Sequence, residues 1–257
     1  MPRFVESTAL LANHRALWEK KPALRAVYSD YHRRLMAAMP DQIDGPVVDL
    51  GGGSGHLKDS FPDVLVFDIL QSRHVDVVGD AHRLPFADNS LRGVVMLDVL
   101  HHLERPVTFL QEIARVLKPG GRIAMIEPAM TPIAWVFFNY IHQDPVDMSA
   151  DPFADTPAAD PNRDPFDSNQ AIPWLIFAKA AGRERFTAAL PDLRVFKRDL
   201  LSLMVYPLTG GFKRWSLMPG ALAGPFLRAE DALMPTLGPM MAFRLMVVLE
   251  KTLGTAN

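Results

Sequence analysis

Residues 47–55 read Val-Val-Asp-Leu-Gly-Gly-Gly-Ser-Gly, an acidic residue within a short apolar run that leads directly into a glycine-rich turn. This pattern is typical of a buried strand ending in a loop whose backbone approaches a ligand, because glycine has no Cβ and accepts a positive φ. The dinucleotide fingerprint Gly-x-Gly-x-x-Gly would need a glycine where the chain has His56, so the spacing differs from it. The stretch indicates a nucleoside-type cofactor.

The composition is that of a folded domain of ordinary charge. The chain has 257 residues, of which 49% are hydrophobic and 22% charged, so it can bury a sizeable core. Its 27 basic and 29 acidic side chains leave a net charge of −2, which gives no electrostatic footprint for nucleic acid. There are no cysteines, which excludes disulfides, thiolate metal sites and cysteine nucleophiles.

The sequence lacks the pattern of a targeting or membrane-spanning segment. Its first residues have no signal-peptide apolar run, and no uninterrupted apolar stretch approaches about 18 residues. We therefore expect a cytoplasmic protein without stable membrane insertion.

From residue 46 to residue 128 the sequence alternates between strand and helix patterns. Apolar runs predict strands at 47–50, 64–67, 75–80, 91–97 and 122–126. A short helix is predicted to begin in 54–60, and a second helix spans 106–117 and is ended by the Lys-Pro-Gly-Gly of 118–121. The alternation indicates an α/β fold with a parallel sheet and right-handed crossovers, whose ligands bind at the carboxyl ends of the strands.

The flanking regions have other patterns. Apolar residues recur at helical spacing from residue 1 to about 45, which predicts helices that could cap a pocket beside the glycine loop. Residues 142–167 hold seven aspartates and five prolines, which favours an irregular, mobile lid. The runs at 193–206 and 242–250 predict late strands that pair antiparallel at one edge of the sheet.

Four aspartates stand at or just past the ends of successive predicted strands: Asp49, Asp68, Asp80 and Asp98. Each alone could cap a helix or begin a turn. Four in succession, the first beside a glycine loop, favour a binding site at one rim of the sheet. There, a carboxylate after the second strand can accept both hydroxyls of a ribose, and one after the third can accept a hydrogen bond from an amine such as that of adenine.

These residues give the chain a close resemblance to the class I S-adenosylmethionine-dependent methyltransferases. The subgroup is the broad one that includes ubiquinone and menaquinone C-methyltransferases and many small-molecule methyltransferases. The matching segments cover about a third of the chain: 47–55, 67–69, 79–90, 97–103 and 112–128. The resemblance implies a Rossmann-like, mostly parallel sheet of seven strands with helices on both faces, whose last strand, here 242–250, is antiparallel.

The resemblance also implies roles at the amino acid end of S-adenosylmethionine. Asp49 would hold that end together with the glycines of the loop, Gly51, Gly52, Gly53 and Gly55. Asp98 and Val99 would line the pocket near the methionine moiety. No phosphate is involved, so a carboxylate can precede the glycines, where it would suit an ammonium group.

At the adenosine end, the resemblance assigns Asp68 to the ribose hydroxyls and Ile69 to packing on the adenine. Asp80 would meet the adenine amine, with the backbone of Ala81 beside it. The expected organisation is one methyltransferase domain in four parts: a helical cap (1–45), a cofactor-binding core (46–130), a lid and substrate region (131–192), and closing strands with an inserted segment (193–257).

Methyl transfer from a sulfonium requires alignment of the nucleophile and exclusion of water. A general base is needed when the nucleophile is a hydroxyl or an acidic carbon. The candidate bases are His101, His102 and His142. The first two form a pair that is frequent throughout the family, which favours a pocket-lining or structural role. His142 is the preferred base or orienting group, with His102 as a second candidate; a surface position in a loop is the alternative for His142.

The acceptor is expected to be a small apolar or aromatic molecule, methylated on oxygen or carbon, because residues 129–241 are rich in large apolar side chains. Neither a nucleic acid partner nor a metal is expected, since the chain has no calcium-loop motif; a homodimer is compatible with the sequence. Two alternatives stay open. One is a non-catalytic methyltransferase-like binding protein, and the other, which the glycine spacing and Asp80 disfavour, is an NAD-dependent oxidoreductase.

Overall fold

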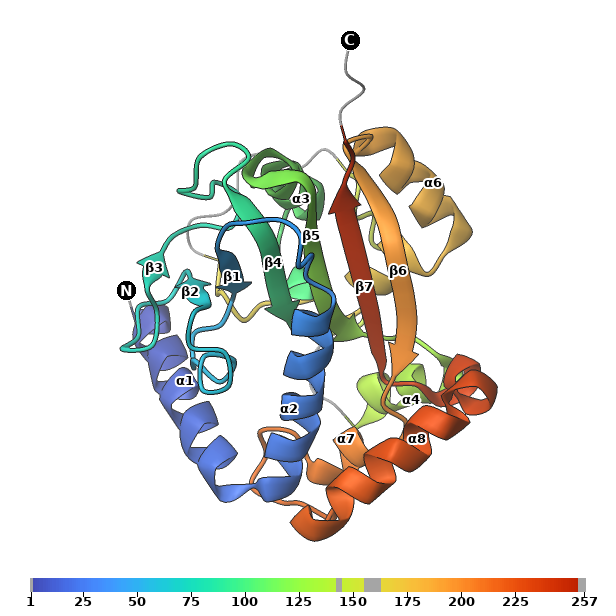
Figure 1. Cartoon of the computed structure of the whole chain (residues 1–257). Helices are drawn as coiled ribbons and strands as arrows, with labels where there is room; N and C mark the ends of the chain where they lie inside the picture. Colours follow the sequence, from blue (N-terminus) through green and yellow to red (C-terminus); the bar gives the residue numbers. More distant parts are fainter. Residues whose placement is uncertain (1, 142–144, 155–162, 254–257) are drawn as a thin grey trace.

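A seven-stranded sheet forms the centre of the protein, and its strand order is β3-β2-β1-β4-β5-β7-β6 (Figure 1). The computed structural model describes residues 2–141, 145–154 and 163–253. The strands are β1 (Val47–Leu50), β2 (Leu65–Asp68), β3 (Val77–Val78), β4 (Leu91–Leu97), β5 (Leu117–Pro128), β6 (Leu193–Leu201) and β7 (Arg244–Lys251). The first five are parallel, and β7 is antiparallel to both β5 and β6. The predicted fold class and the antiparallel last strand are confirmed.

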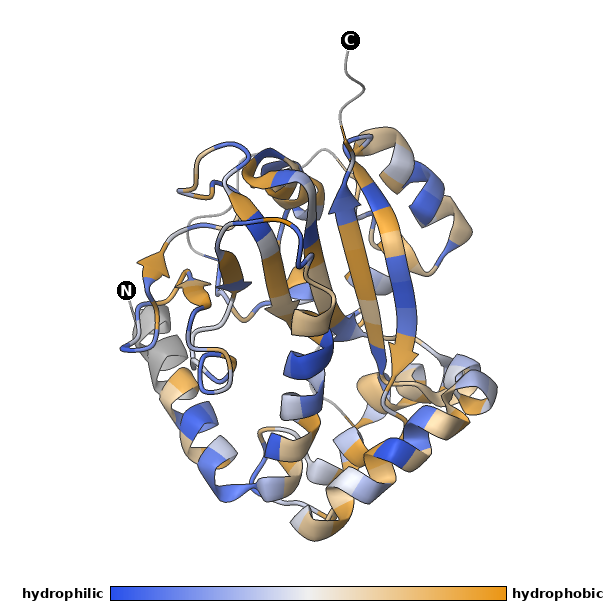
Figure 2. Ribbon diagram, in the orientation of Figure 1, coloured by the Kyte–Doolittle hydropathy of each residue, from blue (hydrophilic) through white to orange (hydrophobic). Residues whose placement is uncertain are grey.

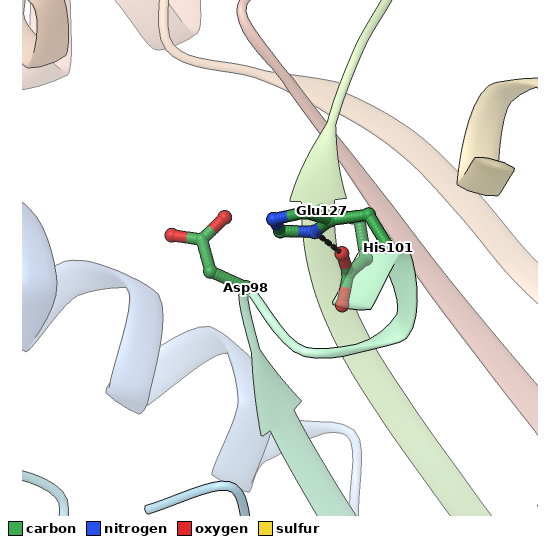
Figure 3. Close-up of side chains that lie close together, drawn as sticks. All are labelled: Asp98, His101 and Glu127. Atoms are coloured by element: carbon green, nitrogen blue, oxygen red, sulfur yellow. Dashed lines mark hydrogen bonds and ion pairs between the residues drawn. The ribbon is translucent and has the colours of Figure 1, made fainter. Parts of the chain in front are cut away.

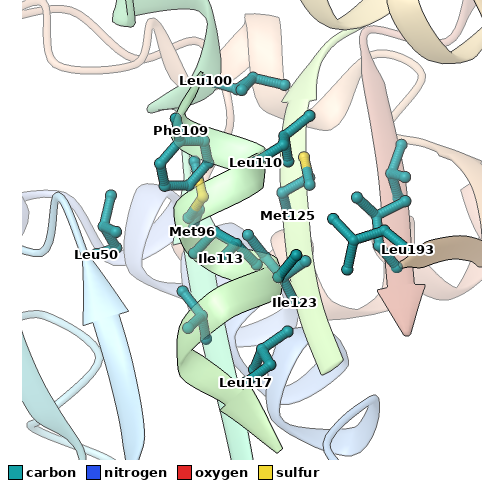
Figure 4. Close-up of a cluster of buried hydrophobic side chains, with 14 of the residues drawn as sticks. Leu50, Met96, Leu100, Phe109, Leu110, Ile113, Leu117, Ile123, Met125 and Leu193 are labelled. Carbon is teal, nitrogen blue, oxygen red and sulfur yellow. The ribbon is translucent and has the colours of Figure 1, made fainter. Parts of the chain in front are cut away.

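Alternating side chains of the central strands enter two separate cores. Val94 and Met96 of β4 face one core, which contains Phe109 and Ile113 of α3 (Pro106–Val116), whereas Val95 faces the other (Figure 4). Strands buried on both faces need apolar residues at every position. Accordingly, the middle of β7 is coloured as hydrophobic, while the edge strand β6 carries a run of polar residues at 197–199 (Figure 2).

The second core is closed by the N-terminal helices. α1 (Pro2–Lys20) is followed by α2 (Pro22–Ala37), and a proline at the start of each favours helix initiation, because its fixed φ suits the first turn. Leu24, Val27 and Leu35 of α2 are fully buried in this core. The predicted helical character of the N-terminal region is therefore confirmed.

The remaining helices lie near the ends and edge of the sheet. They are η1 (Leu100–His102), α4 (Pro132–Tyr140), α5 (Ile172–Phe177), α6 (Ala180–Ala189), α7 (Val205–Thr209) and α8 (Gly220–Met241). In Figure 1, α2, α4, α7 and α8 gather at the end of the sheet toward which β4 and β5 point. This is the end at which ligands of parallel sheets bind. Over the described residues, none of the helices combines the length and apolar character needed to cross a bilayer.

Several predicted elements have other boundaries in the structure. The prediction of a helix that begins in 54–60 is wrong, and the segment forms successive turns. Gly55, near its start, has a left-handed backbone (φ 70°), and Pro62 follows the segment closely. The third strand shortens to Val77–Val78, and the fifth extends back to Leu117. The run 193–206 divides into β6 and α7. The four-part division of the chain stays a prediction.

Candidate active site

The glycine loop after β1 brings two carboxylates together. The backbone N–H of Gly53 donates to Oδ2 of Asp68 at 2.9 Å, so the loop is tied to the end of β2. Gly51 and Gly55 have φ of 76° and 70°, a region that glycine enters without a steric penalty. A Cβ on Gly52 would lie 2.2 Å from Oδ2 of Asp49. Only glycine therefore allows the chain to pass so close to the Asp49 side chain.

The two carboxylates at this loop, Asp49 and Asp68, both have raised pKa values. Asp49 is buried within β1, and burial together with the neighbouring Asp68 raises its pKa to about 7. Burial also raises the pKa of Asp68, although the N–H groups of Leu70 and Gly53 oppose that shift. Two buried carboxylates side by side are an environment in which a cationic ligand group would be stabilised.

The predicted adenosine-binding residues lie along the outer part of the same rim. Asp68 is the last residue of β2, and Ile69 follows it with 46% of its surface exposed. Asp80 comes two residues after β3 and accepts from the backbone N–H of His82 at 2.9 Å. Ala81 beside it is buried. An exposed apolar side chain flanked by two carboxylates could hold a nucleoside, with the ring against Ile69 and polar groups against the acids.

Asp98 comes directly after β4 and adopts a left-handed backbone, with φ of 59°. It forms a two-point ion pair with the buried Arg244, the first residue of β7; the second contact joins Nη2 to Oδ2 at 3.0 Å. The guanidinium also lies 4.2 Å above the ring of Tyr206. This partner could not be predicted from the sequence, because Arg244 reaches Asp98 only through the antiparallel placement of β7.

Next to this ion pair, His101 of η1 meets Glu127 at the end of β5 (Figure 3). Nδ1 of His101 lies 2.6 Å from Oε2 of Glu127, and both residues are buried. Oε1 of Glu127 accepts from the N–H groups of Val99 and Leu100 at 2.9 and 2.8 Å. Burial raises the pKa of Glu127, and those two N–H groups oppose the shift. The carboxylate thus fixes both the imidazole and the start of η1.

Asp98, His101 and Glu127 are a group of possible metal ligands within the described part of the chain, with atoms within 4.8 Å of one another. Their existing bonds do not fit a metal well. Glu127 already accepts two backbone N–H groups and contacts His101, while both oxygens of Asp98 are held by Arg244. A cation would have to displace these partners, so we assign the group to hydrogen bonding.

A cavity of about 550 Å³ connects the glycine loop to the lid region. Its lining includes Asp49, Gly51, Gly52 and Asp98. It also includes several aromatic residues, namely Phe137, Phe138, Phe166, Tyr206, Phe212 and Trp215. Arg244, His101 and His102 belong to the same lining. Asp68, Ile69, Asp80 and Ala81 are not among the described residues that line it, so the adenosine end would lie outside this cavity.

A stack of aromatic rings joins α1 to the glycine loop. His56 stacks on Trp18 of α1 with ring centroids 4.2 Å apart, and His14 of α1 stacks on Phe212 at 4.3 Å. His14, His32 and His56 all line the cavity. Burial lowers the pKa of His14 and His32 to about 4 and that of His56 to about 3. These imidazoles are therefore neutral near pH 7 and form an uncharged part of the cavity lining.

Of the two preferred catalytic candidates, His102 is described by the structure and His142 is not. His102 lines the cavity, and burial beside His101 lowers its pKa to about 4. Its Nδ1 lies 3.4 Å from the backbone oxygen of Asp167. His142 lies outside the described residues, so its role stays a prediction. The contact between His101 and Glu127 was missed, although the end of the fifth predicted strand at Glu127 placed that carboxylate at the correct rim.

Part of the chain is similar to known methyltransferases. Residues 48–125 match a family model described as a methyltransferase domain. The chain is 31% identical over 127 residues to a demethylmenaquinone methyltransferase of Renibacterium salmoninarum, covering 42% of this chain and 54% of that protein. It is 30% identical over 138 residues to a ubiquinone/menaquinone biosynthesis C-methyltransferase of Paracoccus denitrificans, covering 42% and 55%. The chain thus spans about half the length of these curated relatives.

Solved structures share the fold. A geranyl diphosphate C-methyltransferase of Streptomyces coelicolor A3(2), in complex with Mg²⁺, a substrate analogue and S-adenosyl-L-homocysteine, superposes with a TM-score of 0.52 at 16% identity, over 87% of this chain and 76% of that one. A methyltransferase of Archaeoglobus fulgidus gives 0.52 at 14% identity, over 89% and 94%. The chain therefore shares its fold with these two methyltransferases. The match at residues 48–125 confirms the resemblance to S-adenosylmethionine-dependent methyltransferases that was drawn from the sequence.

Proposed function

We propose that the protein transfers a methyl group from S-adenosylmethionine to an oxygen or carbon of a small apolar or aromatic acceptor. The observation that carries this proposal is the cavity that joins the glycine loop to an aromatic wall. S-adenosylmethionine, when bound, supplies a sulfonium methyl group as the electrophile. The protein's own contribution is to align an acceptor with that group and to exclude water.

The cofactor would be held along the rim. Asp49, Asp98 and Val99 would surround its amino acid end together with Gly51, Gly52, Gly53 and Gly55. Asp68 would accept the ribose hydroxyls, while Ile69, Asp80 and Ala81 would hold the adenine. The donor set fits this group: carboxylates suit an ammonium and ribose hydroxyls, and the missing Cβ at Gly52 leaves the approach beside Asp49 open.

Calorimetry with S-adenosylhomocysteine tests cofactor binding directly. We expect Asp68→Ala to weaken binding at least about tenfold, because a lost hydrogen bond to a charged group is worth roughly 1.5–3 kcal/mol. Asp63→Ala, an exposed aspartate just before β2, is the matched control and should bind as the native protein does. Tight binding of NAD without binding of S-adenosylhomocysteine would refute the proposal.

Turnover requires a second experiment. Methyl-labelled S-adenosylmethionine is offered with a panel of hydroxylated aromatic and lipid-like acceptors, and the label is followed into product. Product formation supports an enzyme. Binding of S-adenosylhomocysteine with no product across the panel would favour the non-catalytic alternative.

A further inference from the structure

We propose that His101 is the general base of this site, that Glu127 positions it, and that the acceptor is an aromatic hydroxyl compound. This inference rests on the proposed methyl transfer and deepens it by naming the base and the substrate class. It departs from the sequence-based interpretation, in which His101 had a structural role and His142 or His102 was the candidate base.

The first step concerns the fixed orientation of the imidazole. Glu127 contacts Nδ1 of His101 at 2.6 Å, and its other oxygen is held by two backbone N–H groups. A carboxylate that accepts from Nδ1–H sets the tautomer in which Nε2 carries the lone pair, which is how a carboxylate orients a catalytic histidine.

The second step concerns where the imidazole faces. In Figure 3 the ring nitrogen that does not contact Glu127 points toward Asp98. His101 and Asp98 both line the cavity, and Asp98 follows β4 at the rim where the methionine end of the cofactor is proposed to lie. Nε2 is therefore directed toward Asp98, a residue of the cavity lining beside the proposed cofactor site.

The third step concerns the acceptor. Flat aromatic side chains make up much of the cavity lining, and two of the charged groups in that lining, Asp98 and Arg244, pair with each other. A neutral aromatic molecule with a weakly acidic hydroxyl matches both features.

The reaction balances with the groups named. The acceptor's O–H proton passes to Nε2 of His101 while an electron pair of the acceptor, on oxygen or on the ring carbon it activates, forms the bond to the methyl carbon. After attack by a ring carbon, that carbon loses its proton and the oxygen takes one up, which restores the aromatic hydroxyl. The bond from that carbon to sulfur breaks and its electrons remain on sulfur, which becomes the neutral thioether. The proton then leaves His101 for solvent. No oxidant, reductant or metal is needed.

The test compares two acceptors of similar shape and different acidity, 1-naphthol and 4-nitro-1-naphthol. Near pH 8 the first is mainly protonated and needs a base, because an ordinary phenol has a pKa of about 10. The nitro compound is already ionised. We expect His101→Gln to lower kcat on 1-naphthol about 100-fold or more and to change kcat on the nitro compound far less. Glu127→Gln should give a smaller loss with the same preference.

Controls separate this inference from folding and from the proposed function. The Kd for S-adenosylhomocysteine and the thermal midpoint should stay close to native in His101→Gln, and His101→Asn is a second variant that retains an amide near Glu127. Glu184→Gln, exposed on α6, should behave as the native protein. No binding of S-adenosylhomocysteine by the native protein would instead sink the proposed function.

Four results would overturn the inference. They are equal losses on both naphthols, no loss on either, an acceptor-dependent loss in His102→Gln instead, and native protein that binds S-adenosylhomocysteine but methylates neither compound. Loss of turnover on adding a chelator, followed by recovery on adding Mg²⁺, would also overturn the inference. It would indicate that Asp98, His101 and Glu127 bind a metal ion and that His101 is not a base.

Discussion

Arg244 and Asp98 are 146 residues apart in the sequence, yet they form a two-point ion pair in the lining of the cavity. The pair links the start of β7 to the end of β4 across β5. Because Arg244 is buried, removing it would leave the carboxylate of Asp98 without its cation in a poorly solvated place.

We expect Arg244→Met to lower the free energy of unfolding by about 3–5 kcal/mol, the usual cost of removing one partner of a buried ion pair. Arg194→Met is the control, because Arg194 is exposed and its partner Glu250 keeps a second cation, Arg122, so the loss should be less than about 1 kcal/mol. Urea unfolding of both variants measures the difference. Similar losses in the two would show that burial does not set the strength of the Asp98 pair.

Gly52→Ala should weaken binding of S-adenosylhomocysteine strongly, because the new methyl group would lie 2.2 Å from Oδ2 of Asp49 and force the loop or the carboxylate to move. Gly224→Ala is the matched control, since the nearest atom there is the end of the Arg228 side chain at 3.9 Å. An alanine in that helix should also be stabilising by roughly 0.5–1 kcal/mol. Calorimetry reads out both variants, and unchanged affinity in Gly52→Ala would exclude the loop from the cofactor site.

Lys21 links the N-terminal helices to the loop after α7. This buried lysine donates from Nζ to the backbone oxygens of Gly211, Lys213 and Trp215. We expect Lys21→Met to cost about 1–3 kcal/mol, because these acceptors lose a charged donor. The adjacent and exposed Lys20 provides the control Lys20→Met. Hydrogen exchange at residues 211–215 should speed up in the first variant alone; equal protection in both would contradict this role.

We expect acid to destabilise the folded protein through three histidines of the cavity lining, His14, His32 and His56. Burial lowers the pKa of His56 to about 3, so the unfolded chain binds its proton at higher pH than the folded chain does. The stability that the neutral imidazole contributes is thus fully present above about pH 6.5 and is lost as the pH falls from there toward the folded pKa. His14 and His32, with pKa values of about 4, act in the same direction.

His56→Phe isolates this effect, because phenylalanine can keep the stack on Trp18 and does not titrate. We expect the urea midpoints of native and variant proteins to diverge as the pH falls from about 6.5 to about 4.5. Asp49 acts in the opposite sense: its raised pKa of about 7 means that its burial costs stability above that pH and less below it. Parallel midpoints across the range would show that His56 does not titrate differently in the two states.

The sequence predicted the parts of the site that depend on strand ends. Asp49, Asp68 and Asp98 lie at the rim because parallel strands end at the same edge, which alternating patterns reveal. The contacts of Arg244 could not be predicted, since they depend on how β7 is inserted between β5 and β6. The segment 54–60 was predicted to begin a helix, because residue spacing alone does not show that Gly51 before it and Gly55 within it adopt left-handed backbones.

The position of β7 has a consequence for synthesis of the chain on the ribosome. This strand completes the middle of the sheet, between β5 and β6, yet it emerges last among the described strands. Until then β5 has an open edge, and such unpaired edges recruit other chains. Arg244 is the first residue of β7, so pairing of β7 with β5 covers the open strand edge and completes the cavity lining at the same time.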